Sequence, residues 1–480
     1  MTHVGDCPVV ERVGWIALRY PDRVAVVGSD KVLRYGELWD RVNAWRKRCL
    51  SLGLPPGSLV AVQSGDGCGL PAAFLGARAA GLVPLLLDSG LPRGRTAAVQ
   101  AAARPAAVLV ADTEAIELTG EPDPPVLPPE AGYVVFSSGT QGVPKGIVGQ
   151  AAGLLAFVDW EIGELDVHPG TRVAMLTSPA FDVVYRDLLL ALCSGGELHV
   201  ADRHVRFAPS AVLAWLAERE IEVLHAVPSL SARWLEAAGQ VVNSVRHTLF
   251  AGEPLYGRHV RRWRQAVPDT RVVNLYGPAE TTLARFYHHV PDDCGDGLQP
   301  VGRPLPGGAV DLVPVGPAGT HGDVRRVEIA TPDGSLGYLP GTCSPDDLAR
   351  LRREDGVTRF QTQDRGLLTA DGDLVVAGRL DSNVKRRGIF VDIMRVEAVA
   401  AELPEVRAAC CVQLESSSEI VLAVLGPDQV TAAGLRHRLR VLLGAEVPDR
   451  VVAVASLPLL PGGKADRRGV RELLNLEDAA

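Results

Sequence analysis

The chain has 480 residues, of which 47% are hydrophobic and 22% charged, so it is long enough for two or three folded domains. Its formal net charge of −8 argues against a general nucleic-acid binder or membrane-surface binder. The N-terminus lacks a signal peptide and the apolar stretches are too short or too interrupted to span a bilayer, so we expect a cytoplasmic protein with no membrane partner.

Short apolar runs alternate with amphipathic helical stretches through most of the chain. A strand predicted over residues 59–63 precedes a helix over 71–80 and a strand over 82–87. Farther along, a strand over 172–177 precedes a helix over 186–193. This alternation predicts an α/β architecture with largely parallel sheets.

The order of predicted helices and strands changes in the last hundred residues. Helices are predicted over 394–403 and 431–443, and strands over 408–413, 420–425 and 450–457. This set has the size of a small independent α+β domain. The eight cysteines are scattered along the chain without a Cys-x-x-Cys pair, so we expect buried free thiols rather than a disulfide framework.

Arginine is used 44 times and lysine only five times, and three lysines lie in the most motif-like segments. Lys145 closes the segment Phe136-Ser-Ser-Gly-Thr-Gln-Gly-Val-Pro-Lys-Gly146, and Lys385 and Lys464 lie in residues 378–388 and 461–467. Glycines let backbone N–H groups approach phosphate oxygens, hydroxyls add donors, and a lysine supplies charge to the outer phosphates. The three lysines together indicate an enzyme that handles phosphates.

Residues 137–146 resemble the phosphate loop of adenylate-forming enzymes, the superfamily of amino-acid adenylation domains, acyl-CoA synthetases and luciferases. The closest resemblance is to the amino-acid adenylation domains of nonribosomal peptide synthetases. The other matching segments are residues 33–38, 81–88, 181–182 and 274–282. The resemblance implies an α/β fold with two parts: a large N-terminal domain of layered α/β subdomains (1–378) and a small mobile α+β domain (379–480), with a hinge near Asp381.

The resemblance also implies where ATP and Mg²⁺ bind. Tyr276 would stack on adenine, Asp364 would hold the ribose hydroxyls, and Arg379 would lie beside the nucleotide. Glu280 would bind the Mg²⁺ that bridges the phosphates, as expected of a hard oxygen ligand. The remaining nucleotide-binding positions are Ser137, Ser138, Gly139, Thr140, Gly142, Lys145, Gly252, Glu253, Asn274, Gly277 and Thr281.

Lys464, flanked by Gly463 and Ala465, is the predicted catalytic residue. Attack of a carboxylate on the α-phosphate builds negative charge that a positioned ammonium stabilises. The resemblance implies that the small domain first presents Lys464 and then rotates near Asp381, so that the phosphopantetheine thiol of a carrier protein reaches the adenylate.

In amino-acid adenylation domains, an aspartate after the first pocket aromatic receives the α-ammonium of the substrate, and Phe181-Asp182 keeps this pair. An α-amino acid is therefore preferred over an aryl or fatty acid, because a buried ammonium needs such a partner. Arg186 leaves two interpretations open. Its stem could fill the pocket and leave room for serine or alanine, our first prediction, or its guanidinium could face a substrate carboxylate or other acceptor. The other pocket positions are Val183, His225, Leu249, Ala251, Leu275, Leu283 and Ala284.

The predicted function is ATP-dependent activation of an amino acid and transfer to a separate carrier protein, as in nonribosomal peptide-type biosynthesis. An acyl-CoA synthetase-type ligase that uses free CoA is one alternative, and a degenerate relative that only binds a carrier is another. We expect a monomer with no nucleic-acid partner, and a small helper protein is a further candidate partner.

Overall fold

The structure is a computed structural model that describes residues 7–29, 31–65, 67–137, 144–237, 239–315, 325–386, 389–401, 403, 405–414, 417, 419–426, 432–459 and 465–477. Its internal contacts divide the chain into two units. The large unit comprises residues 1–310 and 328–361, and the small unit comprises residues 311–327 and 362–480.

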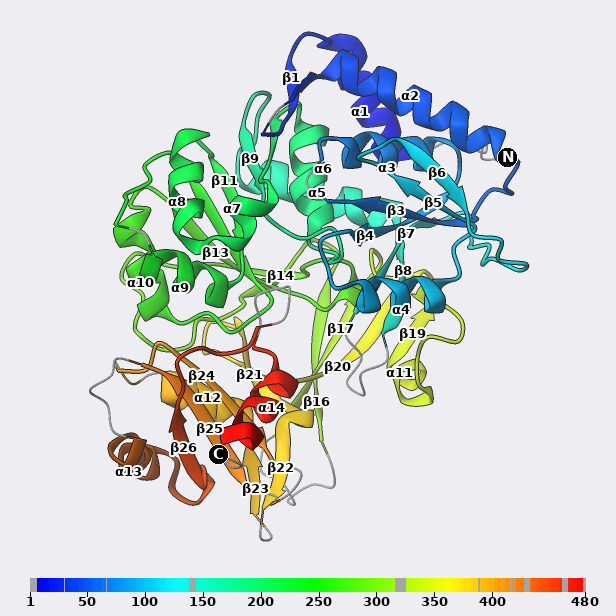
Figure 1. The fold of residues 1–480 in the computed structure, drawn as a ribbon. Helices are drawn as coiled ribbons and strands as arrows, with labels where there is room; N and C mark the ends of the chain where they lie inside the picture. Colours follow the sequence, from blue (N-terminus) through cyan, green and yellow to red (C-terminus); the bar gives the residue numbers. More distant parts are fainter. Residues whose placement is uncertain are drawn as a thin grey trace. The chain divides into compact units, whose positions relative to one another are not determined.

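One sheet of the large unit has parallel strands at its centre and antiparallel strands at both edges (Figure 1). Its order is β15 (Arg303–Pro304), β14 (Phe286–His289), β13 (Arg271–Tyr276), β12 (His247–Ala251), β11 (Val223–Ala226), β9 (Arg172–Met175), β10 (Glu197–Val200), β1 (Val24–Val27) and β2 (Val32–Arg34). The parallel centre is what the alternation of strands and helices in the sequence predicts.

A second sheet of the large unit repeats this plan, with parallel inner strands and antiparallel edges. Its order is β18 (Gly337–Tyr338), β8 (Lys145–Gln150), β7 (Ala131–Ser137), β4 (Val83–Asp88), β3 (Leu59–Ser64), β5 (Ala107–Val110) and β6 (Ala115–Leu118). Every residue of β4 is buried, as expected of a parallel strand covered on both faces.

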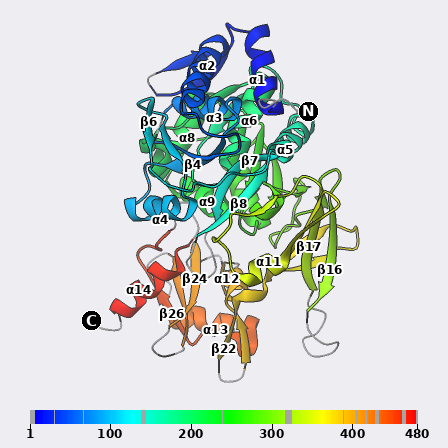
Figure 2. The same ribbon diagram turned by 90° about the vertical axis from the view of Figure 1, so that its right-hand side faces the viewer.

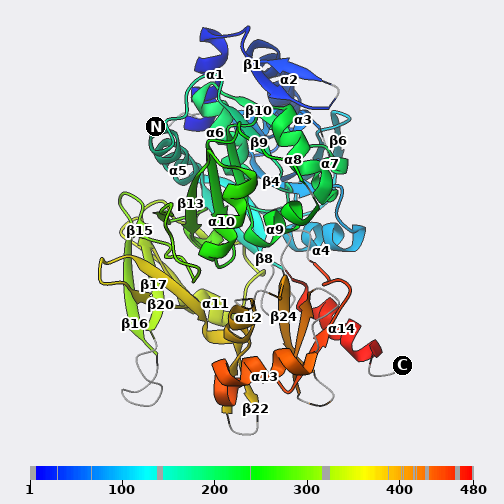
Figure 3. The same ribbon diagram turned by 90° about the vertical axis from the view of Figure 1, so that its left-hand side faces the viewer.

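Helices cover both faces of the first sheet, and the strands alternate between two buried clusters accordingly. On β11 and β12, Leu224 and Phe250 belong to the cluster formed with α8 (Pro209–Glu218), α9 (Pro228–Ala237) and α10 (Gly257–Ala266) (Figure 3). Val223 and Leu249 face the opposite way, into the cluster formed with α5 (Ala151–Glu164) and α6 (Val184–Ser194). This is the two-residue period of a strand buried on both sides.

The other helices of the large unit are α1 (Pro8–Arg19), α2 (Tyr35–Ser51), α3 (Gly69–Ala79), α4 (Arg93–Ala103), α7 (Arg203–Phe207) and α11 (Pro345–Arg350). A short 3₁₀ helix, η1 (Ala279–Thr281), follows β13. In the part of the chain that the structure describes, no helix combines the length and the apolar character that a bilayer crossing needs. All eight cysteines are described; each is a free thiol and seven are buried, which confirms the expectation.

Three strands cross the division between the units. They are β16 (Ala309–Pro314), β17 (Arg325–Thr331) and β20 (Val357–Leu368). Before the division β20 pairs antiparallel with β19 (Leu351–Glu354), and after it β20 pairs antiparallel with β21 (Leu374–Arg379).

The small unit is built on a sheet in the order β24 (Ala408–Gln413), β25 (Ile420–Leu425) and β26 (Arg450–Ala453). The helices α12 (Ile393–Ala401) and α13 (Ala432–Leu443) pack on one face, and α14 (Arg467–Glu477) packs on the other (Figure 2). The remaining elements are η2 (Leu380–Ser382), β22 (Asn383–Arg386), β23 (Ile389–Asp392) and η3 (Gly444–Glu446). The strand expected over 450–457 ends earlier, at Ala453, and the predicted α/β class is confirmed.

Candidate active site

The predicted phosphate loop connects two antiparallel strands of the second sheet. Ser137 is the last residue of β7 and Lys145 the first residue of β8, and the two are paired across the ladder. The predicted positions Ser138, Gly139, Thr140 and Gly142 lie outside the described residues. The strand pairing therefore fixes the two ends of the loop.

Lys145 is surrounded by acidic and phenolic side chains. Its Nζ lies 3.0 Å from Oδ1 of Asp347 and 4.0 Å from Oε1 of Glu280. The hydroxyl of Tyr338 donates to the same Glu280 oxygen at 3.0 Å. Asp347 is held in place by the capping box of α11, where it also meets Ser344. A nearly buried ammonium beside a buried carboxylate is an arrangement that can bind phosphate oxygens and a cation together.

Glu280 is buried, and its environment bears on metal binding. Burial raises the pKa of Glu280 despite the nearby charge of Lys145 and the hydrogen bond from Tyr338. A carboxylate whose charge is costly in isolation gains from a nearby cation. Among the described residues no group of three His, Cys, Asp or Glu side chains could hold a metal ion. Mg²⁺ commonly needs only one or two carboxylates together with substrate phosphates and water, so Glu280 fits that ion.

The turn between β13 and η1 connects the predicted adenine-stacking residue, Tyr276, with Glu280. Tyr276 ends β13 with its ring 5.9 Å from that of Phe286. A Cβ at Gly277 would lie 2.4 Å from the carbonyl oxygen of Leu283 and 2.7 Å from the backbone nitrogen of Arg285. Only glycine permits this close approach of two chain segments.

The other predicted nucleotide positions of the large unit are distributed around this turn. Asn274, on β13, donates from Nδ2 to the carbonyl of Pro300 at 2.7 Å. Thr281 donates from its hydroxyl to the carbonyl of Pro278 at 2.9 Å. Gly252 follows β12 with φ +87°, and the carboxylate of Glu253 accepts from the backbone N–H of Ser229. These bonds hold the backbone at the ends of two adjacent parallel strands, where open α/β sheets bind ligands.

The predicted ammonium-binding residue, Asp182, lies just before α6. Its charge acts on the pKa values of Tyr133, Tyr185 and Glu280, so it lies close to all three. The ring of Phe181 lies 6.0 Å from the guanidinium of Arg95. The structure therefore brings Asp182 and Glu280 into one neighbourhood.

Most of the predicted substrate positions lie on three adjacent strands and the turn after them. His225 on β11 is paired with Leu249 on β12, and Ala251 on β12 is paired with Leu275 on β13. The four side chains are buried. Val183 caps the N-terminus of α6, and the buried Leu283 and Ala284 follow η1.

A fully buried ion cluster surrounds His225. Its Nε2 lies 2.6 Å from Oε1 of Glu161 on α5, and its Nδ1 lies 2.8 Å from Oδ1 of Asp187 on α6. Burial opposes the charged imidazole, but the charge of Glu161 and the close contacts with both carboxylates outweigh burial, and the pKa of His225 is raised. The positive charge of Arg186 acts in the opposite direction, which shows that Arg186 lies close to this cluster.

The small unit brings three predicted residues together. Asp364 and Arg379 are paired across β20 and β21, with Nη1 of Arg379 3.3 Å from Oδ1 of Asp364. The same guanidinium binds Asp381 in bidentate fashion, at 2.7 and 2.6 Å. The predicted catalytic residue, Lys464, lies outside the described residues.

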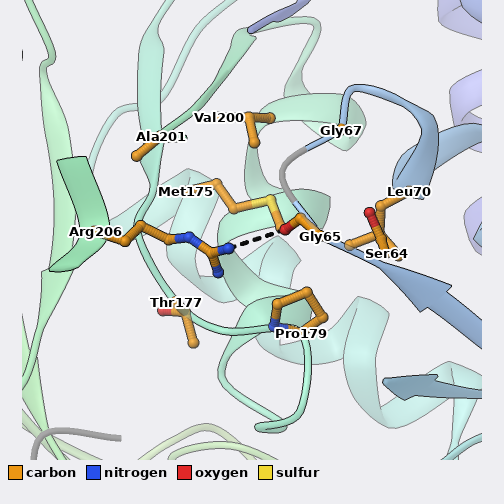
Figure 4. A pocket seen from close by; sticks show the side chains of 10 residues that line it. All are labelled: Ser64, Gly65, Gly67, Leu70, Met175, Thr177, Pro179, Val200, Ala201 and Arg206. Carbon is orange, nitrogen blue, oxygen red and sulfur yellow. Dashed lines mark hydrogen bonds between the residues drawn. The ribbon is translucent and has the colours of Figure 1, made fainter. Parts of the chain in front are cut away.

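A separate small pocket is lined by residues that do not belong to the predicted site (Figure 4). Arg206 donates to the carbonyl of Gly65 at 2.9 Å, and its guanidinium lies 3.5 Å from Asp88. The other lining residues are Ser64, Gly67, Leu70, Met175, Thr177, Pro179, Val200 and Ala201. A second pocket beside α1 is also distinct from the predicted positions.

The side chains that complete both clusters were not among the residues predicted from the sequence. Tyr338 and Asp347 lie beside Glu280 and Lys145, and Glu161 and Asp187 hold His225. Tyr338, Asp347, Glu161 and Asp187 all lie outside the segments that resemble the family. No local signal in the sequence could have identified them.

Comparison with known proteins identifies one family. The family described as AMP-binding enzyme matches residues 14–127 and 111–325. The chain is 30% identical over 487 residues to the AMB antimetabolite synthetase AmbB of Pseudomonas aeruginosa, covering 95% of this chain and 38% of that protein. It is also 30% identical over 501 residues to the phosphinothricin tripeptide synthetase PhsC of Streptomyces viridochromogenes, covering 95% of this chain and 44% of that protein. The chain thus spans less than half the length of these two relatives.

Solved structures share the fold. The structure of Klebsiella oxytoca NpsA in complex with 3-hydroxyanthranilyl-AMSN superimposes with a TM-score of 0.81 at 20% identity, covering 97% of this chain and 99% of that one. A four-domain nonribosomal peptide synthetase bound to AMP and glycine gives a TM-score of 0.80 at 22% identity, covering 97% of this chain and 36% of that one.

Proposed function

The chain belongs to the AMP-binding enzyme family, and from that premise we propose that it activates an α-amino acid with ATP. The products are an aminoacyl-adenylate and pyrophosphate. The aminoacyl group is then transferred to the phosphopantetheine thiol of a separate carrier protein. Both curated relatives described above are named as synthetases, one of them of a tripeptide, which supports a role in peptide-type biosynthesis.

One observation carries this proposal: Lys145 and Glu280 meet where the strand β8 begins, directly after the phosphate loop. Their charged atoms lie 4.0 Å apart, and Asp182 acts electrostatically on Glu280. Within the large unit, Lys145 would thus supply a cation for the outer phosphates, Glu280 a carboxylate for Mg²⁺ and Asp182 a carboxylate for the substrate ammonium. These are the charges that a reaction between ATP and an amino acid requires.

Glu280 would hold Mg²⁺, whose role when bound is to neutralise phosphate charge. Lys145 would bind the outer phosphate oxygens, and Tyr276 would stack on adenine. In the small unit, Asp364 would accept hydrogen bonds from the ribose hydroxyls, and Arg379 beside it would bind the nucleotide.

In the first half-reaction, a carboxylate oxygen of the amino acid attacks the α-phosphorus, and the bond between that phosphorus and the bridging oxygen of pyrophosphate breaks. Lys464 would stabilise the charge that develops on the phosphoryl oxygens and would orient the carboxylate. In the second, the carrier thiol attacks the acyl carbonyl, loses its proton and displaces AMP. A change of position of the small domain, with Asp381 as its hinge, would admit the carrier between these steps.

The substrate is proposed to be a small or polar α-amino acid of the serine or alanine type. Asp182 would receive its ammonium, since this carboxylate lies beside Glu280 and the two tyrosines Tyr133 and Tyr185. A monomer acting in the cytoplasm on a carrier in trans is the arrangement we propose, with a small helper protein as an additional candidate partner.

The test is ATP–pyrophosphate exchange with a panel of amino acids in both chiralities and with aryl and fatty acids as controls. We expect a strong signal with one amino acid or a few related ones. Exchange with aryl or fatty acids alone would overturn the role of Asp182. Exchange with no acid, from folded protein that binds ATP, would favour the non-catalytic alternative.

The acceptor is tested separately, by offering the activated amino acid to holo-carrier protein, to apo-carrier protein and to free CoA. We expect aminoacylation of the holo-carrier only. Thioester formation on CoA at a comparable rate would instead assign the chain to the acyl-CoA synthetase type.

A further inference from the structure

Arg186 is the one buried arginine of the described residues whose guanidinium has no acceptor. Arg78, Arg186 and Arg285 are the arginines with little exposure, at 8%, 3% and 2%. Arg78 donates to the carbonyl of Leu82, and Arg285 donates to three carbonyls and pairs with Asp333. Within the described chain no hydrogen bond or ion pair reaches Arg186, and its Nε is buried without a partner.

The two carboxylates of this cluster face the ring of His225, and neither oxygen of Asp187 makes a hydrogen bond. Glu161 and Asp187 lie within ion-pair distance of His225, on opposite sides of its ring. Arg186 is close enough for its charge to act on His225, but it is not within 4.0 Å of either carboxylate. A buried guanidinium left in this state is costly unless a ligand supplies an acceptor.

The cluster around Arg186 is balanced in charge before any ligand binds. The raised pKa of His225 favours its protonated form, so two cations, Arg186 and His225, face two carboxylates, Glu161 and Asp187. A ligand carboxylate would add an uncompensated negative charge to this buried group. An apolar ligand would leave the guanidinium unpaired. An uncharged oxygen satisfies the donors and keeps the balance.

Arg186 is one helical turn from the proposed ammonium-binding residue. The backbone N–H of Tyr185 donates to the carbonyl of Asp182 at 3.0 Å, where the chain enters α6. Asp182 lies in the turn that leads into α6, and Arg186 lies in the first turn of the helix itself. An amino acid whose ammonium meets Asp182 therefore has a short side chain within reach of Arg186.

Building on the proposed function, we propose that Arg186 donates to an uncharged oxygen, a hydroxyl or a carboxamide, at the end of a short substrate side chain. This excludes alanine as the preferred substrate and also excludes dicarboxylic amino acids. Arg186 is then the residue that sets the chemical class of the substrate.

The wild-type enzyme is tested first, by pyrophosphate exchange with side chains matched in size. The pairs are serine with 2-aminobutyrate, threonine with valine, and asparagine with leucine, and aspartate is compared with asparagine. We expect the best oxygen-bearing substrate to exceed its apolar match by at least about 100-fold in kcat/KM, because a site built to donate rejects a ligand without an acceptor. A preference for an apolar amino acid or for a dicarboxylic one would overturn the inference and leave amino-acid activation standing.

Arg186→Met and Arg186→Gln then assign the effect to the guanidinium. We expect Arg186→Met to reduce the discrimination within the best pair to about tenfold or less, while Arg186→Gln, which keeps an N–H donor, retains more of it. Equilibrium binding of ATP checks that both variants are folded. Unchanged discrimination in Arg186→Met would overturn the inference, and the wild-type pairs still decide if the variants do not fold. Exchange with no amino acid at all would instead refute the proposed function on which the inference rests.

Discussion

Arg285 shows how a buried charge can stabilise the turn on which the site depends. It follows the predicted substrate positions Leu283 and Ala284 and is almost fully buried. Its Nε donates to the carbonyls of Thr281 and Thr282 at 2.7 and 3.1 Å. Thr282 and Leu283 have φ values of +65° and +54°, a conformation that non-glycine residues seldom adopt. The hydrogen bonds from Arg285 offset the cost of this turn.

Arg285→Met should therefore lower the free energy of unfolding by about 3 kcal/mol, because it removes those bonds and leaves Asp333 without its partner. Urea denaturation measures the change. Arg246→Met is the matched control, since the side chain of Arg246 is 74% exposed, and it should change stability by less than about 0.5 kcal/mol. Equal effects of the two substitutions would contradict the role given to Arg285.

Lys464 is expected to act on the transition state rather than on nucleotide binding. Lys464→Ala should reduce pyrophosphate exchange by at least about 100-fold, the size of effect seen when a donor to developing charge is removed. The dissociation constant of ATP should change little. Lys47→Ala, on the exposed surface of α2, is the control and should leave both quantities unchanged. Near-normal exchange by Lys464→Ala would remove this residue from the mechanism.

At the scale of elements, the turn between β13 and η1 is held by close backbone contact. A Cβ at Gly277 would meet backbone atoms of Leu283, Ala284 and Arg285 at 2.4 to 2.8 Å. Backbone cannot move aside as a flexible side chain can. The geometry of Glu280 and of the predicted substrate positions therefore depends on this glycine.

Gly277→Ala should cost about 1–3 kcal/mol of stability, the usual effect of overpacking, and should lower exchange activity as well. Gly163→Ala is the control because a Cβ there meets nothing within 4 Å and the residue is exposed on α5. The control should be neutral or stabilising by up to about 1 kcal/mol, since alanine favours a helix over glycine. A harmless Gly277→Ala, measured in the same denaturation and exchange assays, would refute the argument.

His225 connects three elements of the fold. It lies on β11, and its partners Glu161 and Asp187 lie on α5 and α6, respectively. Its pKa is higher in the folded protein than the value of about 6.5 expected in the unfolded chain. The protonated ring therefore contributes stability that is fully present below about pH 6.5 and is lost as the pH rises through the folded value.

The stability difference between the wild type and His225→Gln should accordingly be largest near pH 6 and should shrink at higher pH. At its largest we expect about 3 kcal/mol, the cost of breaking a buried ion pair. Denaturation midpoints measured from pH 5.5 to 9 give this curve. A difference that stays constant over this range, or grows with pH, would show that the ring is not protonated in the folded state.

At the scale of the whole molecule, each buried cluster draws its members from one unit. The clusters that contain Leu249, Leu224 and Leu59 belong to the large unit, and those that contain Leu422 and Val470 belong to the small unit. Since hydrophobic cores are the main source of cooperativity, the two units are expected to unfold in separate steps.

Leu422→Ala and Leu224→Ala test this separation, because both leucines are fully buried, one in each unit. Each substitution should cost about 2–5 kcal/mol in its own unit. In calorimetry, Leu422→Ala should lower one transition and leave the other in place, and Leu224→Ala should do the reverse. A single transition that both substitutions lower equally would contradict two independent cores.

Much of the fold could be predicted because its signals are local. The expected strands over 59–63, 408–413 and 420–425 are present, and the parallel arrangement follows from the alternation of strands and helices. The strand predicted over 450–457 ends at Ala453 because the apolar run continues past the last residue that pairs with β25. Hydrophobic periodicity reports which residues are buried, but hydrogen-bonded partners decide where a strand ends.

The sequence by itself determined the family, the α/β class and the residues that lie in contiguous motifs, among them Lys145, Glu280 and Asp364. Only the tertiary structure decided which side chains accompany them. Lys145 meets Asp347 from 202 residues away, and His225 meets Glu161 from 64 residues away. Such pairs leave no local pattern, because chain folding rather than sequence spacing brings their atoms together. For the same reason the lack of an acceptor at Arg186 is visible only once every neighbour of that guanidinium has its place.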